Sequence, residues 1–271
     1  MGWMTKDPVP QAQVDAAKAY EALMVPALFG QWASRVADAA QIAPGMRVLD
    51  VACGTGILAR EAASLVGPAG FVTGLDPNAG MLEVARQLAP ALEWRQGVAE
   101  SLPFEDQSFD AVLSQFGLMF FDAPQKALRQ AHRVLISGGR LAVAVWDSLD
   151  NNPAYAAEVV LLERLAGQPA ADAVRAPFRL GNRRDLGKLF EEAGVTSLEV
   201  VSHQGLARFP SVRVMVEADL RGWLPVMRVV LSEEEIARIL EEAERVLDRY
   251  VRTDGTVEFE CSAHIIPGSK P

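Results

Sequence analysis

Val48-Leu-Asp50-Val-Ala52-Cys-Gly54-Thr-Gly56 is the stretch of this 271-residue chain that decides its fold. Residues 47–51 form a short run rich in β-branched side chains, which is typical of a buried parallel strand. The glycines that follow allow a sharp turn and a close approach of the backbone to another molecule. They also leave the N–H groups at the start of the next helix free to bind polar groups. The stretch therefore predicts a strand, a binding turn and a helix, in that order.

Strands and helices alternate on both sides of this turn. Helices are predicted at 57–66, 78–89 and 122–135, and strands at 71–76, 92–96, 109–115 and 140–146, with a turn at Gly138-Gly139 before the last of these. Residues 11–42 carry apolar side chains at helical spacing and predict two short helices, because Pro26 and Gly30 break the run. This alternation predicts a parallel sheet with right-handed crossovers.

The last third of the chain has a different pattern. Residues 150–182 contain three prolines and predict short helices and loops, followed by a helix at 183–194. Two strands are expected at about 197–209 and 256–266, with helical segments near 211–224 and 232–251 between them. We expect these helices to cover one end of the sheet. The resulting division is an N-terminal helical cover (1–42), a ligand-binding core (43–149) and a C-terminal part of the same domain (150–271).

Composition and charge exclude several classes of protein. The net charge is −9, and no run of Lys and Arg forms the basic stripe that neutralises phosphates, so nucleic acid is not expected as a partner. No apolar stretch approaches the roughly 20 residues needed to span a bilayer, and the N-terminus lacks the pattern of a signal peptide. We therefore expect a cytoplasmic protein without membrane insertion. The two cysteines, Cys53 and Cys261, do not form a C-x-x-C pair, so neither a disulfide framework nor a metal site is expected.

Asp76 ends the predicted second strand. An acidic side chain at this place can accept hydrogen bonds from the two hydroxyls of a ribose. Asp is also a favoured helix cap, so capping of the next helix is the alternative role. Together with the glycine turn, Asp76 points to a ligand that contains adenosine.

These residues and four further segments resemble the class I S-adenosylmethionine-dependent methyltransferases, in particular the small-molecule branch that includes the ubiquinone/menaquinone-biosynthesis methyltransferases. The resemblance covers about residues 46–146, and its motifs occur in the family's order. Besides the glycine turn they are Gly74-Leu-Asp76-Pro-Asn-Ala-Gly-Met81-Leu82, Ala99-Glu-Ser-Leu-Pro103-Phe104, Ser108-Phe-Asp110 and Arg133-Val-Leu-Ile-Ser-Gly138-Gly139. The resemblance implies an α/β fold, Rossmann-like and doubly wound, with a mostly parallel seven-stranded sheet, an antiparallel late strand and a helical cover.

The resemblance also implies that S-adenosylmethionine is the cofactor, S-adenosylhomocysteine the product and a small molecule the methyl acceptor. Asp50, Ala52 and Gly54 would then surround the methionine part of the cofactor. Gly56 would permit close packing, and Cys53 would be a small side chain beside the turn. Ala52 stands where the family has its first glycine.

The remaining cofactor contacts implied by the resemblance come from segments farther along the chain and from the N-terminal cover. Asp76 would bind the ribose. Pro77 and Met81 would pack against the adenosine, and Ala99 and Glu100 would read its adenine edge. Gln115 and Phe116 would line the border with the acceptor, and Tyr20 would cover the cofactor from the N-terminal side. Val98 replaces an aspartate that is common before the alanine of the adenine segment. Glu100 could equally be a solvated turn residue, and Tyr20, Met81 and Phe116 could be ordinary core.

No catalytic residue is assigned from the sequence. Of the three histidines, His132 is expected to be structural, and His203 and His264 lie in the late strands, where they could simply be packed or solvated. Methyl transfer is an in-line displacement that can be accelerated by holding the reactants close and aligned. A general base is therefore needed only if the acceptor must lose a proton. The acceptor's identity, the methylated atom (C, O or N) and the oligomeric state, monomer or homodimer, stay open.

Two other functions remain possible. Gly54-Thr-Gly56-Ile-Leu-Ala59 also satisfies the looser dinucleotide-binding pattern, which would suit an NAD(P)-dependent reductase. Short-chain reductases use a Tyr-x-x-x-Lys pair, but the residues four places after the three tyrosines are Met24, Val159 and Asp254. A non-catalytic, methyltransferase-like binding protein is the second alternative, because a fold alone does not determine function.

Overall fold

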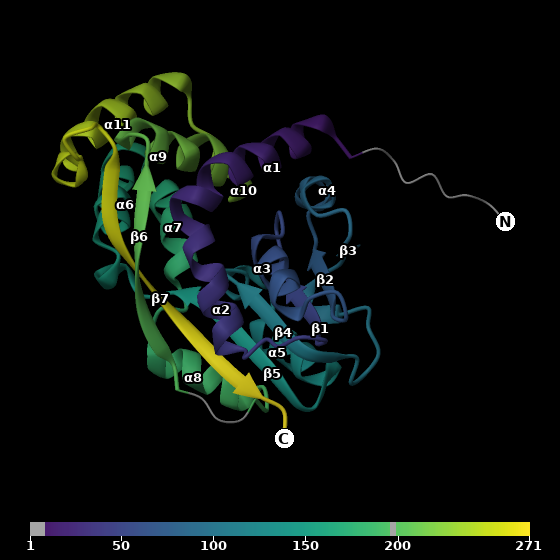
Figure 1. The fold of residues 1–271 in the computed structure, drawn as a ribbon. Coiled ribbons are helices and arrows are strands. Elements are labelled where there is room, and N and C mark those ends of the chain that lie inside the picture. The colour runs from purple at the N-terminus through teal and green to yellow at the C-terminus, as the bar shows by residue number, and fades with distance from the viewer. Residues whose placement is uncertain (1–8, 196–198) are drawn as a thin grey trace.

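A seven-stranded sheet forms the centre of the computed structural model, which describes residues 9–195 and 199–271 (Figure 1). The strand order is β3-β2-β1-β4-β5-β7-β6. The strands are β1 (Arg47–Val51), β2 (Phe71–Asp76), β3 (Glu93–Gln96), β4 (Phe109–Gln115), β5 (Leu135–Trp146), β6 (Val201–Phe209) and β7 (Val257–Ser269). Strands β1 to β5 pair in parallel, whereas β7 is antiparallel to both β5 and β6. The fold class expected from the sequence is confirmed.

Helices cover both faces of the sheet and gather beyond one end of it. They are α1 (Gln11–Met24), α2 (Ala33–Ala39), α3 (Ile57–Val66), α4 (Ala79–Leu88), α5 (Pro124–Val134), α6 (Pro153–Ala166), α7 (Gln168–Arg175), α8 (Arg183–Glu192), α9 (Val212–Ala218), α10 (Leu224–Val226) and α11 (Glu233–Val246). Figure 1 shows α6, α7, α9 and α11 grouped where β6 finishes, as expected for a cover. Of the expected strand 197–209, residues 197 and 198 lie outside the described part of the chain.

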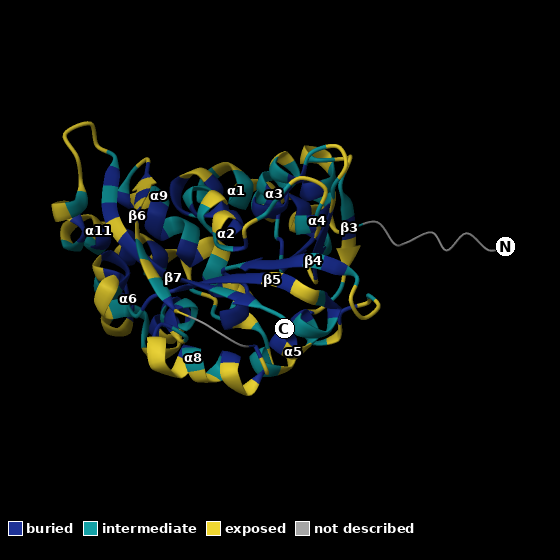
Figure 2. Cartoon of the chain, turned by 60° about the horizontal axis from the view of Figure 1, so that its bottom comes forward, coloured by how far each residue is buried: buried dark blue, intermediate teal, exposed yellow. Residues whose placement is uncertain are grey.

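The central strands form the core because their side chains are apolar on both faces. Val48 and Leu49 of β1 and Val112 and Leu113 of β4 are almost completely buried, as parallel strands between two helical layers require. Figure 2 shows β4 and β5 mostly in dark blue between two layers of helices whose outer faces are exposed. The order of the strands reverses at β1, which lies between β2 and β4. Ligands of open α/β sheets bind at such a reversal, beyond the carboxyl ends of the strands.

The segment Gly138-Gly139 is not the separate turn expected from the sequence. It lies within β5, which begins at Leu135, and the pairing of β4 with β5 shifts register between Phe109 and Ala111. Gly138 has a φ of +75°, which a residue with a side chain rarely adopts. The end of β7 completes the pairing, because the Gly138 N–H donates to the Lys270 carbonyl at 2.8 Å and the Lys270 N–H to Gly139 at 3.0 Å. Pairing with a strand distant in sequence therefore makes this segment part of β5, although its local sequence predicts a turn.

Pro26 and Gly30 change the helical pitch of the N-terminal segment rather than breaking it. A π-helical turn (η1, Val25–Phe29) and a 3₁₀ turn (η2, Gly30–Trp32) join α1 to α2. Pro26 lies inside this continuous helical run, where it cannot donate an N–H to the preceding turn, and the wider π turn accommodates it. None of the helices within residues 9–195 and 199–271 has the length and apolar character that a bilayer crossing requires.

Candidate active site

The turn after β1 runs through left-handed backbone conformations. Ala52, Gly54 and Gly56 have φ values of +59°, +54° and +87°. A Cβ on Gly54 would meet no atom within 4 Å, so the turn is open on that side. A Cβ on Gly56 would lie 2.3 Å from the ring of Trp94, so Gly56 is required for close packing. Helix α3 begins directly after Gly56 without a side-chain cap, which leaves its first N–H groups available.

Asp50 presents a buried and unpaired carboxylate beside this turn. The residue is 1% exposed, and neither carboxylate oxygen has a hydrogen-bond partner within the described parts of the chain. Burial raises the pKa of Asp50 well above its ordinary value, the neighbouring charge of Asp76 raises it further, and the nearby backbone N–H of Ala59 in α3 opposes the increase. Burying a carboxyl group without a partner costs on the order of several kcal/mol of folding free energy. The site is therefore suited to a cationic or hydrogen-bond-donating ligand.

Asp76 is held in place by two backbone N–H groups. Its Oδ2 accepts from Gly54 at 2.9 Å and its Oδ1 from Asn78 at 2.8 Å. Burial raises the pKa of Asp76, and these two hydrogen bonds oppose the increase. The cap of α4 is Asn78, whose Oδ1 accepts from Gly80 and Met81. Capping therefore does not account for Asp76, and each of its oxygens retains lone pairs for a ligand.

The surroundings of Cys53 do not favour a nucleophilic role. Burial raises the pKa of its thiol well above the ordinary value, and the charges of Asp50 and Asp76 raise it further. A thiolate, which is the nucleophilic form, is therefore disfavoured. A Cβ on Gly74 of β2 would lie 2.9 Å from the sulfur, so the glycine at position 74 leaves room for the Cys53 side chain.

Helix α1 brings Tyr20 to the same edge of the sheet. The Tyr20 ring stacks on Phe29 with 5.4 Å between centroids. Burial raises the pKa of Tyr20, as do the charges of Glu21 and Asp76, so the hydroxyl stays protonated at neutral pH. Glu21 is also paired with Arg60 of α3 at 2.8 Å, which connects the N-terminal cover to the helix that follows the glycine turn.

Five aromatic side chains meet beyond the ends of β4 and β5; we call Phe29, Trp32, Phe116, Trp146 and Phe178 the aromatic cluster. The rings of Phe116 and Trp146 stack at 4.0 Å, and Trp32 meets both edge-on at 5.8 Å. Phe29 lies 5.6 Å from Phe116, and Phe178 lies 6.4 Å from Trp146. Phe116 has a φ of +56°, a strained conformation for an aromatic residue. The cluster forms an apolar wall next to the glycine turn, because a Cβ on Gly117 would touch Ala52.

Gln115 joins this wall to the N-terminal cover. Its Nε2 donates to the Phe29 carbonyl at 3.1 Å, whereas its Oε1 is buried without a partner within the described residues. Trp32 Nε1, Thr55 Oγ1 and Ser114 Oγ are likewise buried and unpaired there. Neither Phe29 nor Ser114 was predicted as a cofactor or acceptor contact from the sequence, because each resembles an ordinary core or strand residue locally.

The expected adenine-side residues have mixed surroundings. Glu100 lies in a 3₁₀ turn after β3, and its Oε1 accepts from the Ala123 N–H at 3.2 Å, so its carboxylate already has a structural partner. Ala99 is buried and Met81 half-buried, whereas Pro77 is exposed. Val98, at the position of the family's aspartate, is exposed and offers no polar group to a ligand.

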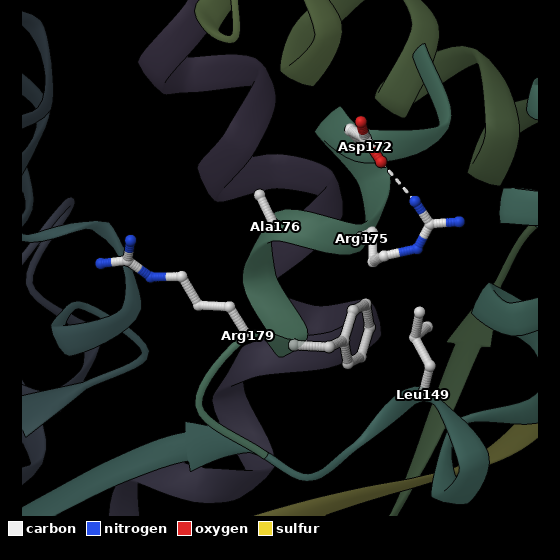
Figure 3. A pocket seen from close by; sticks show the side chains of 6 residues that line it. Leu149, Asp172, Arg175, Ala176 and Arg179 are labelled. Carbon is white, nitrogen blue, oxygen red and sulfur yellow. Dashed lines mark hydrogen bonds and ion pairs between the residues drawn. The ribbon is translucent and has the colours of Figure 1, made fainter. Parts of the chain in front are cut away.

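A cavity lined by residues of the C-terminal part of the chain lies away from the glycine turn. Its volume is about 330 Å³, and it is bordered by Leu149, Phe178 and the ion pair of Arg175 with Asp172 (Figure 3). Arg179 extends to its other side and donates to the Phe121 carbonyl at 2.9 Å. Phe178 is shared between this cavity and the aromatic cluster. No group of three or more His, Cys, Asp or Glu side chains suited to a metal ion occurs in residues 9–195 and 199–271.

Comparison with known proteins agrees with this geometry. The family model described as a methyltransferase domain matches residues 49–143. A demethylmenaquinone methyltransferase of Renibacterium salmoninarum is 44% identical over 115 residues, which are 42% of this chain and 47% of that protein. This chain thus spans about half the length of that relative. A demethylmenaquinone methyltransferase of Staphylococcus aureus is 33% identical over 188 residues, which are 64% of this chain and 78% of that protein.

A solved structure extends the likeness to the fold of nearly the whole chain. Phosphoethanolamine N-methyltransferase 2 of Haemonchus contortus, in complex with phosphomonomethylethanolamine and S-adenosylhomocysteine, superposes with a TM-score of 0.59. It is 18% identical, and the match covers 96% of this chain and 58% of that one, so it bears on the fold alone. The domain match and the Staphylococcus relative carry the assignment of family. This chain belongs to the class I S-adenosylmethionine-dependent methyltransferases and is similar to those of quinone biosynthesis.

Proposed function

We propose that this chain transfers a methyl group from S-adenosylmethionine to a small, partly apolar molecule and releases S-adenosylhomocysteine. The observation that carries the proposal is the unpaired Asp50 carboxylate, which is buried beside the open turn at Gly54. A buried anion without a partner is costly unless a ligand pairs with it. The donor has an ammonium group and a sulfonium, and both suit a site that contains Asp50 and Asp76.

The residues of the turn fit this donor. Asp50 would accept from the ammonium group, and the N–H groups at the start of α3 would face the carboxylate. The free lone pairs of Asp76 would accept from the ribose hydroxyls, with Tyr20 covering this edge. Pro77, Met81, Ala99 and Glu100 would border the adenosine. The bound donor supplies a methyl group that is already activated by its sulfonium charge.

The acceptor would lie against the aromatic cluster. Gln115 and Phe116 lie where this wall meets the turn after β1, so a flat apolar acceptor there would face the donor's methyl group. Flat rings pack well against aromatic side chains, and exclusion of water strengthens the polar contacts of the site. Proximity and alignment would then supply much of the acceleration, without an assigned base. The relatives named for demethylmenaquinone support an acceptor with a quinol-like ring.

The parts of the chain would divide this work as follows. Residues 9–42 would cover the donor, residues 43–149 would bind it, and residues 150–271 would shape the acceptor site. We further propose that the enzyme acts in the cytoplasm on a free small molecule and binds no nucleic acid, because its net charge is −9.

The proposed function is tested by calorimetric titration with S-adenosylmethionine and by transfer of a labelled methyl group to a panel of quinols, phenols, amines and lipids. Binding of the donor and a labelled product are expected, with Asp50→Asn losing most of the donor affinity. Glu61→Gln, on the outer part of α3, is the matched control and should bind normally. If NADH binds and S-adenosylmethionine does not, the reductase alternative replaces this proposal; donor binding without any labelled product would favour the non-catalytic one.

A further inference from the structure

The helices of residues 148–181, here called the cap insertion, leave the sheet and return to it at one point. The insertion starts after β5 and contains α6, α7 and a 3₁₀ turn (η6, Ala176–Phe178). Its last residue, Gly181, lies directly against its first: a Cβ on Gly181 would be 2.2 Å from the Ser148 nitrogen and 2.5 Å from the Asp147 carbonyl carbon. The two ends of the cap insertion are therefore in contact where β5 finishes.

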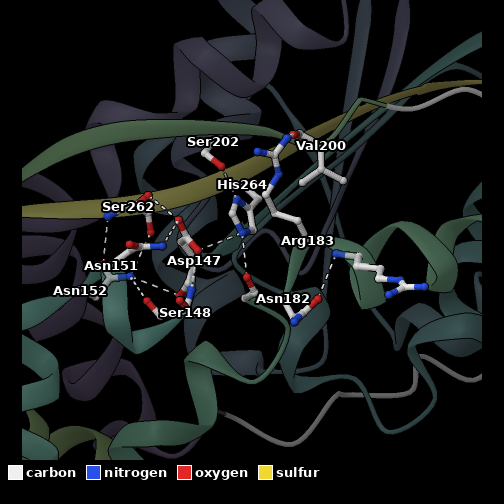
Figure 4. Close-up of polar contacts among 12 residues, drawn as sticks. Asp147, Ser148, Asn151, Asn152, Asn182, Arg183, Val200, Ser202, Ser262 and His264 are labelled. Carbon is white, nitrogen blue, oxygen red and sulfur yellow. Dashed lines mark hydrogen bonds and ion pairs between the residues drawn. The ribbon is translucent and has the colours of Figure 1, made fainter.

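His264 of β7 contacts Gly181, the last residue of the cap insertion, and Asp147, which directly precedes its first residue. Its Nε2 lies 2.9 Å from the Gly181 carbonyl oxygen and 3.1 Å from Asp147 Oδ1, and its Nδ1 lies 3.0 Å from Ser202 Oγ of β6 (Figure 4). The Gly181 and Asp147 oxygens can only accept, so Nε2 carries the hydrogen. The His264 side chain is almost completely buried, so water cannot replace these contacts.

Asp147 extends the contacts to the start of the insertion. Its Oδ1 accepts from the Ser148 N–H at 2.7 Å, and its Oδ2 accepts from Ser262 Oγ at 2.8 Å and Asn151 Nδ2 at 3.1 Å. Asp147 is buried, so these hydrogen bonds do not compete with bulk water.

Asn152 connects the same group to α6, which begins at the next residue. Its Oδ1 accepts from the Ser262 N–H at 3.0 Å, and its Nδ2 lies within 3.3 Å of the carbonyl oxygens of Asp147, Ser148 and Ser262. The start of the first cap helix is thus held by the same strand that carries His264.

These contacts act on the wall proposed for the acceptor. Trp146 immediately precedes Asp147, and Phe178 lies three residues before Gly181. The contact between the Trp146 and Phe178 rings therefore depends on how the ends of the insertion are held. His264 cannot reach this wall itself, because it pairs with Val145 in the sheet and side chains alternate between faces, which puts Trp146 on the opposite face.

We propose that His264 is a positioning residue: through Nε2–H it joins Gly181 to Asp147 and so sets the acceptor wall formed by Trp146 and Phe178. The inference rests on the proposed function, because it assigns the acceptor to this wall. It predicts that His264 controls affinity for the acceptor and leaves affinity for the donor unchanged. His264 touches neither of them.

Three variants separate this role from general packing. His264→Gln can place an amide N–H near the position of Nε2, whereas the shorter His264→Asn cannot. Ser202→Ala removes only the partner of Nδ1, which belongs to β6 and not to the cap insertion. We expect His264→Asn to raise the acceptor KM by about tenfold or more, the loss that an unsatisfied buried polar group typically causes, with kcat within about twofold. His264→Gln should restore most of the affinity, and Ser202→Ala should behave as the parent protein.

Hydrogen exchange and donor titration make the test independent of the acceptor. In His264→Asn, amides of residues 153–178 should exchange about tenfold faster while those of β1 and β2 keep their protection. The dissociation constant of S-adenosylmethionine should stay within about twofold of the parent. Unchanged exchange in the cap insertion, equal acceleration throughout the sheet, or failure of His264→Gln to restore protection would each overturn the inference. A parent protein that does not bind S-adenosylmethionine would instead overturn the proposed function.

Discussion

Asp76 carries the most specific prediction for a single residue. Its two oxygens each hold one backbone N–H, and their remaining lone pairs face the proposed ribose. Asp76→Asn keeps an oxygen acceptor but loses the charge. Because charge-assisted hydrogen bonds contribute about 1.5–3 kcal/mol each, the affinity for S-adenosylmethionine should fall by about 10- to 100-fold. Calorimetry measures this loss. Asp106→Asn, an exposed acid on a distant loop, is the control, and equal affinities of the two variants would contradict the ribose assignment.

Ala52 and Gly54 form a natural pair for testing backbone strain. Both residues have a positive φ, but only Ala52 has a Cβ, so only Ala52 is sterically strained by this conformation. The left-handed conformation costs a residue other than glycine about 1–2 kcal/mol of stability. Replacing alanine with glycine removes this strain, but the greater freedom of glycine in the unfolded chain offsets about 0.5–1 kcal/mol of the stabilisation. Ala52→Gly should therefore stabilise the protein by about 0.5–1 kcal/mol, and Gly54→Ala should destabilise it by a similar amount. Urea unfolding without cofactor tests the pair, and shifts of the same sign would refute the explanation.

Helix α1 is the element whose contribution to binding should exceed its contribution to stability. Within α1 only Val14 and Ala17 are fully buried, whereas the following π turn inserts Val25, Ala27 and Leu28 into the core. Removal of residues 1–24 should then cost at most about 2–3 kcal/mol of unfolding free energy, from the burial of two side chains and their neighbours. It should nevertheless reduce donor affinity about tenfold or more, because Tyr20 and the Glu21–Arg60 pair are lost.

Gly80→Ala is the matched variant for this truncation. A Cβ on Gly80 would lie 2.5 Å from the Gln13 carbonyl oxygen, so α1 must move away from α4 without the loss of any residue of α1. Thermal unfolding and donor titration are measured for both variants. Full donor affinity in the truncated protein would mean that α1 is no cover.

At the scale of the whole molecule, stability should fall as the pH rises through neutrality. Burial raises the pKa of Asp219 to about 7, and burial together with the charge of Asp219 raises the pKa of Glu158 well above its usual value. A raised pKa means that the folded state keeps a proton which the unfolded state has lost. The contribution of Asp219 is therefore fully present below about pH 4, declines by up to about 1.4 kcal/mol per pH unit, and is lost above about pH 7.

Asp219→Asn tests this decline, because an amide resembles the protonated acid. Its unfolding free energy should match that of the parent near pH 4 and exceed it at pH 8.5. Asp150→Asn, exposed near the start of the cap insertion, should follow the parent at both values. A parallel decline in the parent and Asp219→Asn would locate the titration elsewhere.

Donor binding by the whole protein should also be independent of metal ions. Within residues 9–195 and 199–271 no cluster of His, Cys, Asp and Glu has the arrangement of a metal site. Titration with S-adenosylmethionine in the presence and absence of a chelator measures this directly, and loss of affinity with the chelator would reveal a metal site.

Much of the fold could be predicted from the sequence because its signals are local. Residues 47–51 and 71–76 are strands with a glycine turn and a helix between them, and β-branched runs, glycines and helical periodicity identify such elements within a few neighbours. Asp76 could be located for the same reason, since its place depends on the end of β2. Local signals fail where pairing with a distant strand overrides the local preference. Gly138-Gly139 predicts a turn, but its hydrogen bonds to the end of β7 make it part of β5.

The sequence by itself therefore determined the fold class, the binding turn and the family, all of which depend on short-range patterns. Only the tertiary structure decided what surrounds these elements: that both oxygens of Asp50 are buried unpaired, that Phe29 and Phe178 meet Phe116 and Trp146, and that His264 joins the two ends of the cap insertion. Most of these contacts join residues that are more than 80 positions apart, for example Phe29 and Phe116 or His264 and Asp147. Such pairs are set by how strands order and helices pack, and no local periodicity records which distant side chain will fill the space beside another.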